Sequence, residues 1–576
     1  MTSNLRDRNY TQQYALIWVI LNFVNFVFIE IFSVFSQLKK QNVFVLNFVL
    51  VSAIVIYLLR NHPTPSLVKL KSGFFWQKFM VVIIFFGSFI SGYAVSPNNW
   101  DSMTYHLGRV FHWYQNESLN HFSATVSRQN YVSPFGDFQS LAILSSGSDR
   151  FAFLPSFISG IIIIVVFLAI CGHLKLPRNV TYAGVFLILA PNFVSQISTT
   201  QVDLRSLAFV MSGLYLLIQG GSFSIFIGVI ALGLSFGTKF LALLPLVGVL
   251  FIPKLRILIF INLKKESKSA ALGFLFGALI NLPWLFRNYG TFGNFTGESG
   301  HIFALNSNLD LRAVDLIRYF STNILYYRIP QFNNFIVEKT NNLLSFMFGS
   351  DESAIPFGLN IDTVYPIATE DDVSSSVLFV TLFFVFLYFI FTRQFRNSLI
   401  FISPFAFTFI ILAWQPWINR LLVPSFVFMV LIGVYFANKG ASEIFRRSVY
   451  LLSILSILTS CLYIVDSDRR GLSGIVSNPT NRIADYFIPR PGLEEDYRSI
   501  SLFLESRNVR YASTIGIEDS WEYPLLVMNQ KIVFVPVDSD LAQYVVCLDS
   551  CATLDISSRT IVLKTNNGLL VYVPKS

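Results

Sequence analysis

Charged residues are scarce in this sequence. Asp, Glu, Lys and Arg make up 13% of its 576 residues, whereas about 25% is typical of a soluble globular domain. The shortage is uneven, because long apolar runs alternate with short polar ones up to about residue 465 and a more ordinary composition follows. This pattern excludes a single soluble domain and predicts a mainly α, polytopic membrane helical bundle with a soluble C-terminal tail.

Cysteine is also rare, with four residues in the chain. Cys171 and Cys461 lie in or beside apolar runs, which indicates inert packing positions. Cys547 and Cys551 lie in the tail with three residues between them, and they could form a small disulfide loop in an oxidising compartment. The spacing alone leaves that pairing open, and no further ligands beside them support a zinc site.

No small-residue cleavage site follows the first apolar run, Tyr14 to Phe35. This run is also longer than a signal-peptide core of roughly 7–15 residues, so we interpret it as a retained first span. The net charge of +9 fits a bias of basic residues toward cytoplasmic loops better than nucleic-acid binding. The expected partner is therefore a lipid bilayer, and no nucleic acid.

A membrane-spanning helix needs about 20 apolar residues, and by that criterion we expect about 13 spans. They are predicted at residues 14–36, 42–60, 78–96, 150–171, 180–198, 203–219, 222–237, 239–254, 269–286, 374–392, 398–414, 421–437 and 448–465. No internal repeat is visible. The predicted domains are a transmembrane part, residues 1–465, with outer loops 97–149 and 287–373, and a small α/β domain, residues 466–576.

Basic residues gather in alternate short loops and predict the orientation. They are Arg6 and Arg8 before the first span, Lys69 and Lys71, Lys264, Lys265 and Lys268, Arg393 and Arg396, and Lys439, Arg446 and Arg447. We expect this side to be cytoplasmic and the C-terminal domain to be extracytoplasmic. The chain is then a multi-pass protein of the inner or plasma membrane, with Lys39 and Lys40 as exceptions on the outer side.

The two largest polar regions carry their own patterns. Loop 287–373 is too long for a simple connection and should contain short helices. In the tail, Glu494 to Ser506 and Ser520 to Asn529 are typical of helices. The predicted strands are Val509 to Ile515, Lys531 to Val537, Tyr544 to Leu548, Thr560 to Lys564 and Leu569 to Val573, with a hairpin turn at Asn566-Asn567-Gly568.

Ionisable residues crowd into the stretch from Asn98 to Asn130, directly after the apolar segment Phe79 to Val95. Three of the chain's 6 histidines lie here. A polar cluster held against a membrane surface is where chemistry is expected. In an α-helix, Asp101, Tyr105, Gly108 and His112 would share one stripe. His106 and His112 fall on different faces, so the spacing does not support a metal site of the i, i+4 kind.

Six basic residues run against the inside bias. Arg205, Lys239, Arg287 and Arg420 lie at the outer ends of predicted spans, and Arg109 and Arg128 lie in the first outer loop. Each could extend to lipid head groups, but as a set they indicate an anionic ligand such as a lipid phosphate. Asp203 begins the sixth predicted span, where it could act in chemistry or compensate the charge of a helix N-terminus.

Several motifs together resemble one enzyme superfamily. They are Trp100-Asp101-Ser102-Met103-Thr104-Tyr105-His106-Leu107, Arg109, His112-Trp113, Arg128-Gln129-Asn130, Thr200-Gln201 before Asp203, Gly237-Thr238-Lys239, Arg287-Asn288, Trp414-Gln415-Pro416-Trp417 before Arg420, and Glu522-Tyr523-Pro524-Leu525. In this order they resemble the GT-C membrane glycosyltransferases. The most similar group is the family-39-like one, which includes protein O-mannosyltransferases and the aminoarabinose transferase of lipid A.

The resemblance implies transfer of a sugar from a polyprenyl-phosphate donor to an envelope glycan, lipid or protein on the outer face. An acid in the first outer loop is the general base of that family and corresponds to Asp101. A second acid corresponds to Asp203. Relatives usually place another acid beside the first, where this chain has Ser102, and often carry one at the position of Asp137. A paired-carboxylate metal site is therefore not supported, and no cofactor is expected.

The remaining site residues follow from the same reasoning. The donor phosphate would be bound by Arg109, Arg128, Lys239, Arg287 and Arg420. Tyr105, His106, His112, Gln129 and Asp137 are expected to bind substrate. Two other classes of protein share the outer cations and the many spans: a flippase or transporter of lipid-linked glycans, which usually shows repeat symmetry, and an O-antigen-type polymerase.

Overall fold

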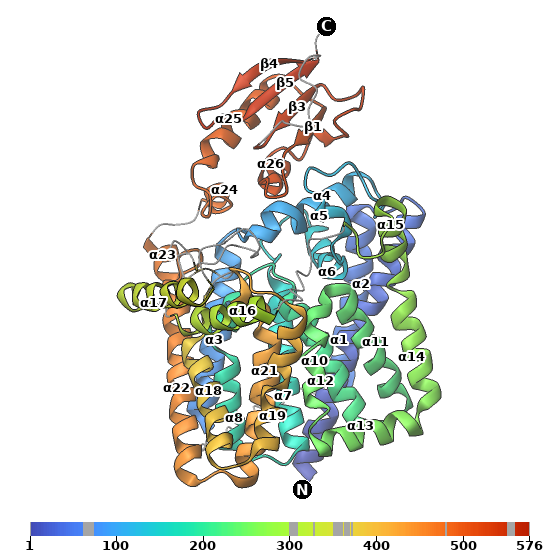
Figure 1. Cartoon of the computed structure of the whole chain (residues 1–576). Helices are drawn as coiled ribbons and strands as arrows, with labels where there is room; N and C mark the ends of the chain where they lie inside the picture. The colour runs from blue at the N-terminus through green and yellow to red at the C-terminus, as the bar shows by residue number, and fades with distance from the viewer. Residues whose placement is uncertain are drawn as a thin grey trace.

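The structure is a computed structural model. It describes residues 2–61, 74–298, 309–325, 329–348, 361, 369, 373–477, 481–549 and 559–574. Figure 1 shows a bundle of long helices that carries a small sheet at one end, with the N-terminus at the opposite end of the bundle. Lys69, Lys71 and Cys551, on which sequence expectations rested, lie outside the described residues.

The helices up to residue 466 run in chain order through the bundle and its outer loops. They are α1 Thr2–Val34, α2 Lys40–Asn61, α3 Phe75–Ala94, η2 Ser102–His106, α4 Leu107–Gln115, α5 Arg128–Tyr131, α6 Phe135–Leu144, α7 Leu154–His173, α8 Arg178–Ile188, α9 Pro191–Ile197, α10 Asp203–Gln219, α11 Ser222–Lys239, η3 Phe240–Leu243, α12 Leu246–Val249, α13 Pro253–Lys265, α14 Ser267–Leu279, α15 Leu282–Phe292, α16 Leu309–Ile324, α17 Pro330–Phe348, α18 Ser376–Phe391, α19 Phe395–Ile411, α20 Ile418–Leu421, α21 Val423–Gly440 and α22 Glu443–Asp466.

Seven helices of the described chain are long and apolar enough to cross a membrane, and an eighth span is possible if the bent pair α8 and α9 is counted as one. This pair is bent by 68° where Pro191 begins α9, since proline lacks the N–H that would continue α8. The apolar helices α18, α19 and α21 are shorter. The protein is therefore a multi-pass, mainly α membrane protein, as the sequence predicts.

The predicted span 239–254 is wrong as a continuous helix. Its residues form the 3-10 turn η3 and the four-residue helix α12, with Pro245 between them. The segment nevertheless runs from one end of α10 to the other. Lys239 lies beside Asp203 at the start of α10, while Asn262 of α13 donates hydrogen bonds to the carbonyls of Leu217 and Ile218 at its end. Residues 255–268, which separate this predicted span from the next, lie mostly in α13.

Helix α10 forms the centre of the bundle. Every residue from Asp203 to Ile218 is buried, and α1, α7 and α11 pack around it. A helix that is apolar on all sides is expected in such a position. By contrast, only 6% of the apolar window of α2 is buried inside the protein, which is typical of a lipid-facing helix.

The C-terminal tail forms the predicted α/β structure. After α23 Leu472–Ser477 and α24 Arg482–Asp485 come α25 Leu493–Ser506, β1 Tyr511–Ile515, α26 Glu522–Met528, β2 Val533–Phe534, β3 Tyr544–Cys547, β4 Arg559–Lys564 and β5 Leu570–Pro574. The strand order is β2-β1-β3-β5-β4, with β1 parallel to β2 and β3 and with β5 antiparallel to β3 and β4. Gly568 takes a φ of +89° in the β4–β5 turn.

The tail and the first outer loop share one hydrophobic core. Met103 and Leu107 pack in the same buried cluster as Trp521 and Leu525. This contact fixes η2 and α4 against α26 and so joins residues more than 400 positions apart. In the long outer loop, α16 and α17 confirm the expected helices. Cys547 is disulfide-bonded, and Cys171 and Cys461 are free thiols.

A substitution at Gly233 tests the close packing of α11 on α14. A Cβ at Gly233 would lie 2.7 Å from the backbone of Gly277, so Gly233→Val must push the two helices apart. We expect a loss of roughly 1–3 kcal/mol of stability, measured as a lower midpoint of thermal unfolding in detergent. Gly290→Val is the matched control, because nothing lies within 4 Å of a Cβ added there. An equal loss in both variants contradicts the packing argument.

Candidate active site

Asp101 lies where α3 gives way to the first outer loop. The next five residues, Ser102–His106, form one π-helical turn. The predicted stripe of Asp101, Tyr105, Gly108 and His112 was based on an α-helix instead. Such π-helical turns are rare and are frequently found at functional sites. The buried Asn99 fixes the turn, since its side-chain oxygen accepts hydrogen bonds from Ser102 N at 3.2 Å and from Thr200 Oγ1 at 3.2 Å. Asp101 is thereby tied to the segment that leads into α10.

Four charged side chains from four distant segments meet beside this turn. Arg420 Nη1 of α20 lies 2.9 Å from Asp101 Oδ2, and its Nε lies 3.7 Å from Asp203 Oδ2. Lys239 Nζ, at the end of α11, lies 2.6 Å from Asp203 Oδ1. We call Asp101, Arg420, Asp203 and Lys239 the outer charge cluster, after the side of the membrane on which the sequence predicts them. Carboxylates and cations alternate along it, so each charge has a neighbour of opposite sign.

The outer charge cluster is largely withdrawn from solvent. The side chains of Asp203 and Arg420 are 3% and 6% exposed, and those of Asp101 and Lys239 are 14% and 22% exposed. Asp203 stands in the first turn of α10, where a carboxylate also compensates the positive end of the helix dipole. The two most exposed members, Asp101 and Lys239, are those that an incoming ligand can reach most easily.

The charge state of Asp101 follows from its surroundings. Burial raises the pKa of its carboxyl group, but Arg420 above all, followed by His106, Lys239 and Arg128, holds this pKa well below its ordinary value. Asp101 is therefore ionised at neutral pH. The pKa of the neighbouring Tyr105 shifts in the opposite direction. Burial and then the Asp101 charge raise it and keep the Tyr105 hydroxyl protonated.

Arg128 connects the tail to this region. Its guanidinium donates to Glu518 Oε2 at 3.1 Å and to Asp519 Oδ1 at 2.8 Å. The same group lies 5.0 Å from the centre of the Tyr105 ring. Arg128 is thus near Asp101 but paired with acids of the C-terminal tail.

The other expected outer cations are paired elsewhere. Arg109 is fully buried and binds Asp137 and the carbonyls of Val132 and Ser133. Arg287 makes a bidentate pair with Glu30 at 2.9 and 2.8 Å. The structure therefore brings Lys239 and Arg420 into contact with the two predicted acids, but does not bring Arg109 or Arg287 there. An acid inside the first apolar run is rare, and Glu30 could have indicated the pair with Arg287.

Arg205 has an internal role in the bundle. Its guanidinium is fully buried and donates to Ser156 Oγ at 3.0 Å, to Ser140 Oγ at 2.8 Å and to the carbonyls of Gly136 and Thr200. These bonds hold the turn before α10, and with it Asp203, in place.

The residues expected to bind substrate form an internal network. His106 Nδ1 lies 2.8 Å from Asp137 Oδ1, and Asp137 also pairs with Arg109. On the other face of the helix, His112 Nε2 lies 3.3 Å from Glu522 Oε1, as expected for two histidines on different faces. Gln129 also donates to Glu522. Apart from Tyr105, these side chains position the first outer loop against α6 and α26.

Glu522 is the acid that sequence reasoning named only as part of a motif. It is fully buried and accepts hydrogen bonds from Thr514 Oγ1 at 2.6 Å and Thr125 Oγ1 at 3.0 Å, in addition to those from His112 and Gln129. Its position at the start of α26 gave no indication of these partners, because they come from β1, α4, α5 and the loop between α4 and α5. Among the described residues, no group of three or more His, Cys, Asp or Glu side chains is arranged to hold a metal ion.

Comparisons with known proteins give a likeness in structure. No family model and no curated protein matches the sequence. The crystal structure of ArnT from Cupriavidus metallidurans in the apo state matches with a TM-score of 0.49 and 12% identity, over 86% of this chain and 97% of that one. The same protein bound to undecaprenyl phosphate matches with a TM-score of 0.46 and 12% identity, over 87% and 98%.

With 12% identity and TM-scores below 0.5, this likeness carries no argument about function. The function is therefore argued from the outer charge cluster.

The buried Glu522 predicts an acid-sensitive contact between tail and first loop. Burial raises its pKa, but His112, Gln129 and Thr514 lower it to about 2 from 4.5. The stability that this carboxylate contributes, of order 3 kcal/mol, is present above pH 4.5 and is lost as the pH falls toward 2. Hydrogen exchange of α26 should therefore accelerate in acid.

The measurement compares exchange of α26 at pH 5 and pH 3, corrected for the intrinsic pH dependence of exchange. Glu522→Gln should lose this part of the acid response, whereas Glu505→Gln, at an exposed position of the same tail, should retain it. An unchanged acid response in Glu522→Gln contradicts the assignment.

Proposed function

We propose that this protein is a membrane glycosyltransferase that moves a sugar from a polyprenyl-phosphate donor to an envelope glycan, lipid or protein on the outer face. The observation that carries the proposal is the outer charge cluster, in which an ionised Asp101 pairs with Arg420 at 2.9 Å. A proton acceptor and two cations that can hold a phosphate are the groups that such a transfer requires.

The donor would bind through its phosphate. Arg420 can offer two parallel N–H groups to phosphate oxygens, and Lys239 adds a point charge. Asp203, which contacts both cations, would keep them in place. A phosphate at Arg420 competes with Asp101 for the same guanidinium. Because Arg420 is the main group that lowers the pKa of Asp101, donor binding would raise this pKa and make Asp101 a stronger base.

The transfer itself is a substitution at the anomeric carbon. The acceptor hydroxyl attacks this carbon while Asp101 removes its proton, and the bond between sugar and phosphate oxygen breaks. The electron pair leaves with the lipid phosphate, whose added negative charge Arg420 and Lys239 would stabilise. The products are the glycosylated acceptor, polyprenyl phosphate and a proton on Asp101.

The proposed membrane side follows from charge. The outer charge cluster lies at the end of α10 opposite α13, and the basic loops predict that the α13 side is cytoplasmic. Because soluble nucleotide sugars are confined to the cytoplasm, a site on the other face requires a donor that is carried by a lipid.

Asp101→Asn tests the proposed base. It preserves the size of the side chain but removes the proton acceptor, so turnover should fall by about 10²–10⁴-fold while donor binding remains. The assay is release of polyprenyl phosphate by protein in liposomes supplied with a polyprenyl-phosphate sugar and an acceptor.

Glu117→Gln is the matched control, because this partly exposed acid of the same loop pairs with Lys39 and should leave turnover unchanged. Near-normal turnover in Asp101→Asn removes Asp101 as the base. Movement of the donor across the membrane without bond cleavage in the wild-type protein would favour a flippase instead.

Arg420→Gln tests donor binding. The loss of a charge-assisted contact should raise KM for the donor roughly tenfold or more. The control is the double variant Glu30→Gln/Arg287→Gln, which removes a paired arginine outside the outer charge cluster without leaving its acid unpaired. It should retain the wild-type KM. Equal changes in both variants would mean that Arg420 has no special role in donor binding.

A further inference from the structure

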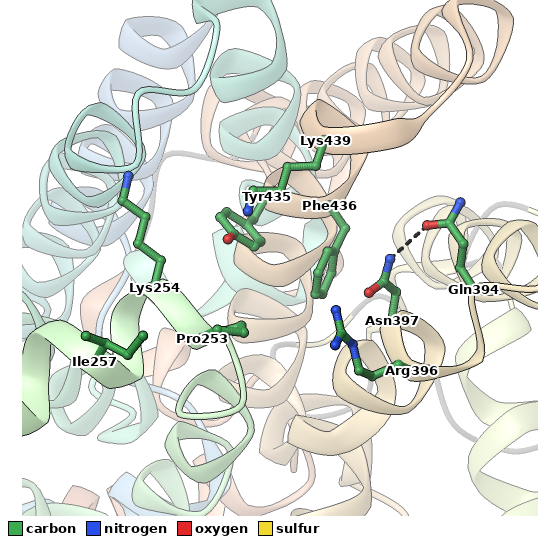
Figure 2. Close-up of a pocket in the computed structure, with 9 residues that line it drawn as sticks. All are labelled: Pro253, Lys254, Ile257, Gln394, Arg396, Asn397, Tyr435, Phe436 and Lys439. Atoms are coloured by element: carbon green, nitrogen blue, oxygen red, sulfur yellow. Dashed lines mark hydrogen bonds between the residues drawn. The ribbon is translucent and has the colours of Figure 1, made fainter.

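A second concentration of positive charge lies at the other end of the bundle. A pocket of about 490 Å³ opens between the start of α13, the start of α19 and the end of α21. Lys254, Arg396 and Lys439 line it, one from each helix (Figure 2). Figure 1 shows α13 at the end of the bundle that carries the N-terminus, away from the C-terminal sheet. This pocket is therefore separate from the outer charge cluster.

The three cations have no acidic partner in the part of the chain that the structure describes. No carboxylate of the described residues forms an ion pair with Lys254, Arg396 or Lys439. Positive charge also acts on Lys254, because burial and then the charges of Lys175 and Lys439 lower its pKa. Like charges held together without a counter-ion raise the free energy of a surface. An anion in the pocket would remove that cost.

Other basic residues of the same end differ from these three. Arg446 and Arg447 pair with Glu443 at 3.3 and 2.9 Å. Lys264 and Lys268 are exposed, as Arg396 and Lys439 are, but they do not line the pocket. A general excess of basic residues on the cytoplasmic side accounts for such positions. It does not account for three cations from distant segments around one hollow.

The walls of the pocket indicate the kind of anion. Buried Tyr435 and Phe436 form one side, and the Lys439 ammonium lies 4.7 Å from the centre of the Tyr435 ring. Asn397 adds an amide, which donates to Gln394 Oε1 at 2.8 Å. Arg396 stands in the first turn of α19, where the positive end of the helix dipole favours an anion. Cations with an aromatic wall at a membrane surface suit a phosphate attached to an apolar body.

The volume of the pocket favours a head group over a bare ion. A water molecule takes about 30 Å³ of liquid volume, and the pocket of about 490 Å³ offers far more room than one phosphate fills. We propose that this pocket binds the phosphate of an anionic phospholipid from the leaflet on the N-terminal side of the bundle. The site is independent of the sugar transfer proposed above.

The experiment measures binding to the full-length protein in neutral detergent by native mass spectrometry. The probes are short-chain phosphatidylglycerol, short-chain phosphatidylcholine as a lipid without net charge, and inorganic phosphate. The pocket variant Lys254→Gln/Arg396→Gln/Lys439→Gln should bind phosphatidylglycerol about a hundredfold more weakly, at roughly fivefold for each cation removed.

The matched control is Lys264→Gln/Lys265→Gln/Lys268→Gln, which removes three charges from the same end of the bundle and should bind as the wild type does. The single variant Arg396→Gln, expected to bind roughly fivefold more weakly, replaces the triple variant if the latter does not fold. Preference for phosphatidylglycerol over inorganic phosphate supports the lipid, whereas equal binding of inorganic phosphate would assign the phosphate site to a soluble anion. Equal affinity of pocket and control variants for every probe overturns the proposal.

Discussion

Compensation of buried charge is the constraint on which the outer end of this protein depends. Asp101 and Asp203 lie in a region from which solvent is largely excluded, and an unpaired carboxylate there would be strongly unfavourable. Arg420 lies between them and Lys239 completes the set. The four side chains come from the first outer loop, α10, α11 and α20, so the bundle must close correctly before any of these charges is satisfied. The same pairing holds the groups that the proposed transfer needs within reach of one another.

The first outer loop has little freedom of its own. Arg109 and His106 meet at Asp137 on one side, while His112 and Gln129 meet at Glu522 on the other. Met103 and Leu107 pack with the tail between these two networks. Polar networks whose members are satisfied make a structure rigid. The C-terminal sheet therefore acts on the site through this loop, and a change far along the sequence can alter the position of Asp101.

The cations at the two ends of the bundle differ in whether they are paired with acids. At the outer end, Arg109, Arg128, Arg287 and Arg420 each have an acid within ion-pair distance. At the end with α13, three cations surround a hollow without a carboxylate partner in the described chain. Paired charges mainly fix structure, whereas converging unpaired charges attract a ligand. An anion that binds in the outer charge cluster must replace Asp101 as a partner of Arg420. An anion that binds in the pocket beside α13 replaces no carboxylate of the described chain.

The sequence by itself determined that the chain crosses a membrane, because apolar runs of this length have no other stable environment in a helical protein. It also predicted the order of helices and strands in the tail, and it marked Asp101, Asp203, Lys239 and Arg420 as candidate site residues, since charges next to apolar runs stand out. Tertiary structure decided which cations meet those acids. The sequence does not distinguish Arg109 and Arg287 from Arg420. In the structure, however, Arg109 is paired with Asp137 and Arg287 with Glu30. It also decided that residues 240–252 cross the bundle without a continuous helix and that Glu522 binds the first loop, because both depend on neighbours that are distant in sequence.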